Sequence, residues 1–376
     1  MKFPSLITYY YKQMFLPTYL LTKFFIKFRI IMEGKVMTKG DIYTKEIIER
    51  ILKEGTLDEN PRPHYKDGTK AHTLSVNHGM CTYDLSKGES PLITLRPIAT
   101  KSSVGELLWI YRDASSNIYD LEKRYGVKWW REWMINPHYY DENGIIQRGS
   151  NPYDGYYYDA NKNKIDIGEK SPTLLDKDFD FKYNIIDSST GNILTPTATI
   201  GSCYGSTVRK HHLFIRLLEG IKNDPFGRRH IMSLWQDDDF RLDHGLKPCA
   251  FLTEWNVRKK DDKYYLDMCL TQRSSDFLTA GCINQTQYAI LLCMVAKHLN
   301  MLPGRFTWFY NNIQIYDRHI DAAKEMLERE PIDCEPKIEV YKNDIYAMNP
   351  NDVEIRNYPI EEIKKKNKQL KLEIAI

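Results

Sequence analysis

The sequence predicts an α+β protein in which helices cover a large mixed β-sheet. Three segments, residues 230–235, 251–257 and 263–271, alternate in the manner of β-strands. Residues 211–223 carry apolar side chains at helical spacing. Residues 287–299 are apolar on nearly all sides, which indicates a central buried helix.

The remaining elements follow from the same periodicities. The sequence predicts helices over 44–54, 102–111 and 317–329, strands over 73–76, 92–95 and 306–316, and a polar, turn-rich segment over 56–72. Glu106 lies among apolar residues of the second helix, and simple exposure on its polar face would explain it.

The chain divides into an N-terminal extension (1–37) and one catalytic domain (38–376) that carries a surface insertion at about 135–200. The insertion is rich in Asn, Asp, Gly and Tyr and lacks hydrophobic periodicity. The extension is apolar and aromatic but contains several lysines, so no stretch reaches the ~20 uncharged residues of a membrane span. A start codon misassigned ahead of Met32 or Met37, a docked extension and a membrane-surface helix all remain open.

Composition excludes several classes of protein. The formal net charge of +3 over 376 residues gives no general attraction to nucleic acid, so nucleic acid is not an expected requirement. The 7 cysteines are odd in number and show no metal-binding spacing. We therefore expect a reduced, cytoplasmic protein with no metal.

Cys249 is the candidate nucleophile. A lone cysteine is more often a small buried apolar residue, but arginines at 228, 229 and 273 flank this one in the sequence. Arginine favours the thiolate and binds phosphate with a forked geometry. The combination suggests covalent chemistry on a nucleotide, although a salt-bridged surface pair would equally explain Arg228 and Arg229.

A polar turn follows the third predicted strand. The string Gln272-Arg273-Ser274-Ser275-Asp276 offers a cation, two hydroxyls and a carboxylate, and Asn284 stands just before the apolar helix. An amide can match both the N3–H and the O4 of uracil. Capping of the helix N-terminus explains Asn284 equally well.

These motifs together resemble the thymidylate synthase family. Pro248-Cys249, the Gln272 to Asp276 string, Asn284, Tyr288-Ala289 and Ile315-Tyr316-Asp317-Arg318-His319 occur in the family's order. Glu106-Leu107-Leu108-Trp109, Asn223-Asp224-Pro225 with Arg228-Arg229, and the terminal Ala375-Ile376 extend the resemblance. It runs from about residue 60 to 376 and implies a thymidylate-synthase-like fold.

The resemblance implies a role for each matching residue in converting deoxyuridylate (dUMP) to thymidylate (dTMP) with 5,10-methylenetetrahydrofolate. Cys249 would attack carbon 6 of uracil, while Glu106 and Tyr204 assist proton transfers. A further implied set holds the nucleotide: Arg273, Ser274 and Arg62 with Arg228 and Arg229 of the second subunit of a homodimer, Asn284 on the base, and Gln314 and Tyr316 on the sugar. Trp130, Trp133, Asp276 and Ile376 would line the folate site.

The chain also departs from the family pattern. Ala250 replaces the common histidine after the cysteine, and Gln314 replaces a sugar-binding histidine. Asn312 and Arg131 stand where acidic residues are usual. The arginine of the first phosphate loop has two candidates, Arg62 and Lys66.

Two other functions are compatible with the sequence. A deoxyuridylate hydroxymethyltransferase would use the same cysteine and folate, with water in place of hydride in the last step. A deoxycytidylate enzyme is disfavoured because Asn284 stands where a carboxylate is expected. The other alternative is a non-catalytic nucleotide- or RNA-binding relative. It is disfavoured by the joint presence of five residues: Cys249, Glu106, Arg273, Asp276 and Asn284.

Overall fold

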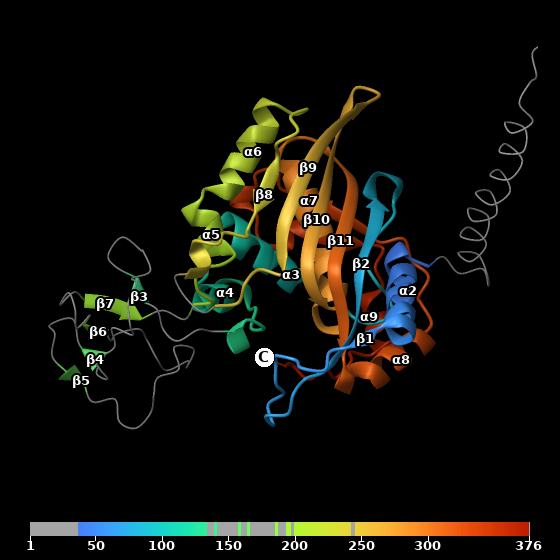
Figure 1. Ribbon diagram of the computed structural model, residues 1–376. Coiled ribbons are helices and arrows are strands. Elements are labelled where there is room, and N and C mark those ends of the chain that lie inside the picture. The colour runs from blue at the N-terminus through green and yellow to red at the C-terminus, as the bar shows by residue number, and fades with distance from the viewer. Residues whose placement is uncertain are drawn as a thin grey trace, which may run out of the picture.

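The protein is described by a computed structural model that covers residues 37–133, 199–241 and 245–375, together with short strands between 139 and 196 (Figure 1). Its centre is a six-stranded sheet with the order β1-β2-β11-β10-β9-β8. The strands are β1 (Thr56–Leu57), β2 (Thr73–Asp84), β8 (Ile231–Ser233), β9 (Ala250–Lys260), β10 (Lys263–Asp276) and β11 (Leu302–Tyr316). The pair β10–β11 is parallel and the other pairs are antiparallel. The predicted mixed sheet is confirmed.

Helix α7 (Cys282–His298) is the buried helix that the sequence predicts. It connects β10 to β11, as a crossover between parallel strands requires. It packs on one face of the sheet with α3 (Thr100–Leu107), which continues as the π-helical turn η2 (Leu108–Arg112). Figure 1 shows both helices behind the sheet.

The other helices lie at the edges of the sheet. At the β2 edge are α2 (Lys39–Glu54) and α8 (Ile320–Glu328), which follows the short helical turn η6 (Asp317–His319) (Figure 1). Toward the β8 edge are α4 (Ile118–Tyr125), α5 (Gly205–Lys210) and α6 (Leu213–Asn223). The chain continues with a hairpin of β12 (Lys337–Val340) and β13 (Val353–Arg356). It then forms the last helix of the described residues, α9 (Ile360–Lys366).

The predicted strand at residues 92–95 is wrong. This segment is buried but does not pair with a strand. Its polar groups form hydrogen bonds with the carboxylate of Asp41 on α2. The carboxylate accepts hydrogen bonds from Thr94 N–H (2.7 Å), Thr94 Oγ1 (2.8 Å) and Leu95 N–H (3.3 Å). Burial raises the pKa of Asp41 to about 6. The polar groups of this segment thus donate to the Asp41 side chain and not to a neighbouring strand, which the sequence pattern had implied.

Element boundaries also differ from the prediction. The first helix begins at Lys39, where Thr38 accepts from Asp41 N–H as its cap, and the buried helix begins at Cys282. Within residues 135–198 the structure describes only strands β3 (Tyr139–Tyr140), β4 (Tyr157–Tyr158), β5 (Lys164–Ile165), β6 (Ile185–Ile186) and β7 (Ile193–Pro196). They pair as β3-β7-β6 and β4-β5. The rest of the predicted insertion and residues 1–36 lie outside the described residues.

Candidate active site

Cys249 immediately precedes β9 and is held through its backbone. Its N–H donates to the hydroxyl of Tyr204 (3.0 Å), and its carbonyl accepts from Arg273 N–H on β10 (2.9 Å). Tyr204 stands at the start of α5 with φ 47°, a left-handed conformation that a tyrosine rarely adopts. The strand pairing and this strained turn therefore bring three distant segments together at one thiol.

Two arginines act on the Cys249 thiol. Burial raises its pKa, and the positive charges of Arg273 and then Arg62 oppose that rise. Because only the thiolate is nucleophilic, the two guanidinium groups favour the reactive form. Residues 62–72, which precede β2, form the first loop. Of its two candidates, Arg62 is the one whose charge acts on Cys249.

Arg273 also supports the turn that carries the cysteine. Its Nε donates to the carbonyl of Pro248 (3.0 Å) and its Nη2 to the carbonyl of Lys247 (2.8 Å). The guanidinium lies over the ring of Trp235, 5.7 Å from its centroid. Ser274 follows on the strand and is half-buried.

Arg228 and Arg229 are exposed in the loop between α6 and β8. Within the described part of the chain, neither side chain has a hydrogen bond or an ion pair. The interpretation of these residues as a salt-bridged surface pair is therefore not supported. Their charges remain available to an anion or to a second subunit.

Glu106 is buried on α3, with 7% of its surface exposed, so simple exposure does not explain it. Its carboxylate accepts hydrogen bonds from Trp130 Nε1 and from Gln287 Nε2 (2.6 Å) of α7. Burial raises the pKa of Glu106, and these donors oppose the rise because they stabilise the charged form. A buried carboxyl with a raised pKa suits proton transfer near neutral pH.

A relay of amides runs from Glu106 to Asn284. Gln287 donates to Glu106, so its Oε1 is left to accept from Asn284 Nδ2 (3.3 Å). Asn284 Oδ1 accepts from Gln272 Nε2 (3.1 Å), and Gln272 Oε1 accepts from Trp308 Nε1 (2.9 Å). A carboxylate can only accept and an indole N–H can only donate, so the two ends of the relay determine how Asn284 is oriented.

The interpretation of Asn284 as a helix cap is wrong. Asn284 is the third residue of α7, and its side chain bonds to two glutamine side chains. The capping side chain is that of Asp276, which accepts from Thr279 N–H at the π-helical turn η5 (Phe277–Gly281) before α7. Sequence reasoning missed Gln272, Gln287 and Trp308 as members of the relay. For Gln287 the signal was the run of polar residues at the start of an otherwise largely apolar helix.

Asp276, Gln314 and Tyr316 lie at the ends of the parallel strands. Asp276 is paired in register with Gln314, and burial raises the pKa of its carboxyl. Burial also raises the pKa of Tyr316; the charges of Asp276 and Cys249 add to this rise, and the charge of Arg62 opposes it. Tyr316 therefore lies within electrostatic reach of the cysteine and of the first loop.

Aromatic rings form one wall of this region. The ring centroid of Trp130 is 5.3 Å from that of Tyr204 and 5.9 Å from that of Trp133. Arg131, at a position usually acidic in the family, forms an ion pair with Glu122 of α4 (2.5 Å). Its charge is therefore compensated by a carboxylate of α4.

The C-terminal end reaches the same region. Ala375 packs with Tyr65, Ala71 and Tyr316 in a small buried cluster, and Figure 1 shows the C-terminus beside the loop that precedes β2. Ile376 lies outside the described residues. Within those residues, no group of three or more His, Cys, Asp or Glu side chains could hold a metal ion.

The fold and this site place a cysteine thiol beside two arginine charges, an arrangement typical of enzymes with a thiolate nucleophile. Comparison with known proteins gives the family. The sequence matches the family described as thymidylate synthase over residues 42–374. Thymidylate synthases of Streptococcus pneumoniae (strain 70585) and Streptococcus gordonii are 37% and 36% identical over 340 residues, which is 90% of this chain and 100% of each relative.

A solved structure agrees with these relatives. Thermostable thymidylate synthase A from Bacillus subtilis superposes with a TM-score of 0.64 at 26% identity, covering 89% of this chain and 99% of that one. The chain belongs to the thymidylate synthase family. It is accordingly a methyltransferase, and the hydroxymethyltransferase alternative is not favoured. No helix among the described residues is long and apolar enough to cross a membrane.

Proposed function

We propose that the chain converts dUMP to dTMP through a covalent bond between Cys249 Sγ and carbon 6 of uracil. The observation that carries this proposal is the convergence on Cys249: two arginine charges act on its thiol, and Tyr204 holds its backbone. Attack by the thiolate makes carbon 5 nucleophilic. Release of the thiolate after methyl transfer restores the enzyme.

The nucleotide is held at three points. Arg273, Ser274 and Arg62 bind the phosphate, for which a forked guanidinium is well suited. Asn284 binds uracil through the oriented amide that the relay provides. The deoxyribose hydroxyl is bound at the end of β11 by Gln314 and Tyr316. Gln314 can both donate to and accept from this hydroxyl, because an amide has a donor and an acceptor.

Glu106 and Tyr204 move protons at the base. Glu106 takes up a proton readily for a carboxyl because burial raises its pKa, and it is linked through Gln287 to Asn284. Tyr204 presents a hydroxyl beside Cys249 and assists removal of the proton from carbon 5. Ala250, where the family often has histidine, is buried opposite Gln272 and supplies no proton.

The residues present fit a reduced folate. Trp130 and Trp133 supply aromatic surface, and Asp276 supplies a half-buried carboxyl for polar ring atoms. Ser275 Oγ, next to Asp276, is buried and lacks a partner among the described residues. The folate supplies the one-carbon unit and the hydride when bound. Ile376 would close over it.

The product of the reaction tests this function. The purified enzyme with dUMP and 5,10-methylenetetrahydrofolate is expected to yield dTMP and dihydrofolate in equal amounts, measured by mass spectrometry and dihydrofolate absorbance. A hydroxymethylated nucleotide with tetrahydrofolate would instead establish the alternative chemistry. No reaction with dUMP would refute both.

One face of the sheet is covered by no helix in the part of the chain that the structure describes, and this face supports a homodimer. On the face away from α7, Met80, Phe309, Thr271 and Leu252 form one row in register across β2, β11, β10 and β9. Met80 is 66% exposed. A row of this composition facing water is typical of a surface that binds a partner, and an isologous dimer covers it on both subunits.

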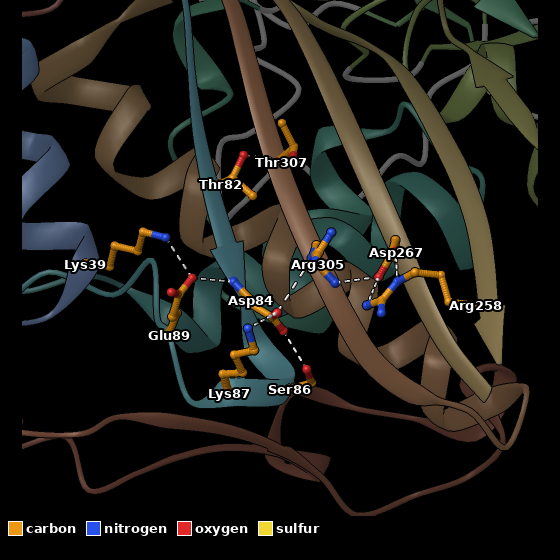
Figure 2. Close-up of polar contacts among 10 residues, drawn as sticks. All are labelled: Lys39, Thr82, Asp84, Ser86, Lys87, Glu89, Arg258, Asp267, Arg305 and Thr307. Atoms are coloured by element: carbon orange, nitrogen blue, oxygen red, sulfur yellow. Dashed lines mark hydrogen bonds and ion pairs between the residues drawn. The ribbon is translucent and has the colours of Figure 1, made fainter. Parts of the chain in front are cut away.

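The charges at one end of this face are already paired with one another. Asp84 of β2 lies 3.6 Å from Arg305 Nε of β11, and Arg305 N–H donates to Asp267 of β10 (2.7 Å). Asp267 is in turn bound by Arg258 of β9 (2.5 Å). Figure 2 shows this ladder across the four strands. Internal pairing lowers the cost of burying these charges beside the apolar row.

Arg228 and Arg229 lead directly into β8, whose Ile231 belongs to the same outer face through its pairing with Glu254. We therefore expect them to bind the phosphate of the other subunit. Mixing an Arg228→Ala protein with a Cys249→Ala protein should restore about a quarter of wild-type activity, because half of the dimers are mixed and each has one intact site.

A second mixture provides the matched control. Arg273 contacts the Cys249 turn of its own chain, so Arg273→Ala mixed with Cys249→Ala should restore nothing. Sedimentation measures assembly and dTMP formation measures activity. An active monomer, or equal recovery in both mixtures, would exclude shared sites.

A further inference from the structure

Two segments border the candidate site without belonging to the sheet. The first loop (residues 62–72) carries Arg62, whose charge acts on Cys249 and Tyr316. The C-terminal segment (residues 373–375) brings Ala375 against Tyr316 and the first loop. Arg62 has no side-chain hydrogen bond or ion pair within the described ranges, so its position depends on how the loop itself is held.

Arg318 contacts both segments with one guanidinium group. Nη1 donates to Glu373 Oε2 of the C-terminal segment (2.8 Å). Nη2 donates to Asp67 Oδ2 and to Thr69 Oγ1 of the first loop (both 2.7 Å). The guanidinium carbon lies 3.9 Å from the ring centroid of Tyr65, a stacking geometry that guanidinium favours.

The surrounding contacts keep Arg318 in this position. Its backbone N–H donates to Asp317 Oδ1 (2.9 Å), which also accepts from the Tyr65 hydroxyl. The next residue, His319, is buried and bonds through Nε2 to the carbonyl of Glu373 (2.9 Å). The C-terminal segment is thus bound by the side chains of two successive residues of η6.

We propose that Arg318 is a positioning residue that fixes the first loop and the C-terminal segment relative to each other and to Tyr316. Through Asp67 it places Arg62 for the phosphate, and through Glu373 it places the C-terminal end over the folate. This inference rests on the proposed function for the identity of the two ligands. The clamp itself is defined by Arg318, Asp67 and Glu373.

The clamp contributes more to binding than to folding. Its side chains are partly exposed, at 36% for Arg318, 53% for Asp67 and 35% for Glu373, and exposed ion pairs contribute little to global stability. Loss of the clamp should therefore leave the melting temperature nearly unchanged. It should instead let two ligand-binding segments move independently, which weakens binding because each must be ordered when its ligand binds.

Three variants separate the two arms of the clamp. Asp67→Asn should raise KM for dUMP by about fivefold and leave KM for the folate unchanged. Glu373→Gln should do the reverse, and Arg318→Ala should raise both. The matched control is Arg356→Ala, because Arg356 also lies near two glutamates and a tyrosine ring (Tyr341), but in the hairpin β12–β13. It should change neither constant.

Hydrogen exchange of residues 370–375 in the ligand-free protein gives a readout that does not depend on the reaction. Arg318→Ala and Glu373→Gln should speed this exchange, whereas Asp67→Asn should speed exchange in the first loop only. Equal KM values in Arg318→Ala and wild type, or an identical pattern for Asp67→Asn and Glu373→Gln, would overturn the proposal. A wild type that makes no dTMP would instead refute the proposed function, and the exchange data would still decide the clamp.

Discussion

Replacing Cys249 by serine is expected to lower kcat by at least about 10⁴-fold, the scale seen when a catalytic nucleophile is removed. A serine hydroxyl at this position has no adjacent base to ionise it, whereas the thiol has two arginine charges that favour its anion. The affinity for dUMP should change little, because the phosphate and base contacts come from other residues. Steady-state kinetics and calorimetric titration with dUMP measure the two effects.

The wild-type protein should also form a covalent complex with 5-fluorodeoxyuridylate and the folate. Peptide mass spectrometry should place the adduct on Cys249. Cys334→Ser is the matched control, since Cys334 is likewise half-buried but lies far along the chain beside the β12–β13 hairpin, and it should behave as wild type. An enzyme that forms no adduct, or one that retains turnover as Cys249→Ser, would remove Cys249 from the mechanism.

The second large effect concerns the choice of base. Wild type should prefer dUMP over deoxycytidylate by at least about 100-fold in kcat/KM, because each mismatched buried polar group costs roughly 1–3 kcal/mol. Asn284 can accept from uracil N3–H and donate to O4. Cytosine reverses both groups, and the relay from Glu106 to Trp308 opposes rotation of the amide to suit it.

Asn284→Asp should shrink this preference, since a protonated carboxyl can donate to N3 of cytosine and its carbonyl can accept from the amino group. Measuring kcat/KM for both nucleotides with both proteins gives the ratio directly. Asn351→Asp serves as the control, because Asn351 is exposed and hydrogen-bonded to Lys101. If the ratio in Asn284→Asp equals that of wild type, the pyrimidine does not bind at Asn284.

The sequence predicted the fold class and most of the long elements, because their hydrophobic periodicity is strong. The segment from Gln287 is apolar on nearly all sides, which indicates a buried helix, and it is one. The prediction was wrong where a side chain from elsewhere in the chain binds the backbone of a segment. Residues 92–95 have the composition of a strand, but a carboxylate more than fifty residues earlier takes their hydrogen bonds, and no local pattern records that.

The motifs likewise determined the family, since several weak signals in the right order are specific together. They also indicated Cys249, Arg273 and Asn284 as site residues from the sequence alone. What they left open were the choice between Arg62 and Lys66 and the two interpretations of Asn284. The charge of Arg62 acts on Cys249, which favours Arg62, and the amide relay excludes the cap.

The sequence by itself determined which chemical groups the protein has and which reaction family they serve. Only the tertiary structure decided how these groups are oriented and which distant segments bind the same charged side chain. The relay joins Glu106 to Gln287, which is 181 positions away. Arg318 contacts Asp67 and Tyr65, which are 251 and 253 positions away. Hydrogen bonds and ion pairs depend on distance and direction in space. The number of residues between two positions in the sequence determines neither the distance nor the direction between them.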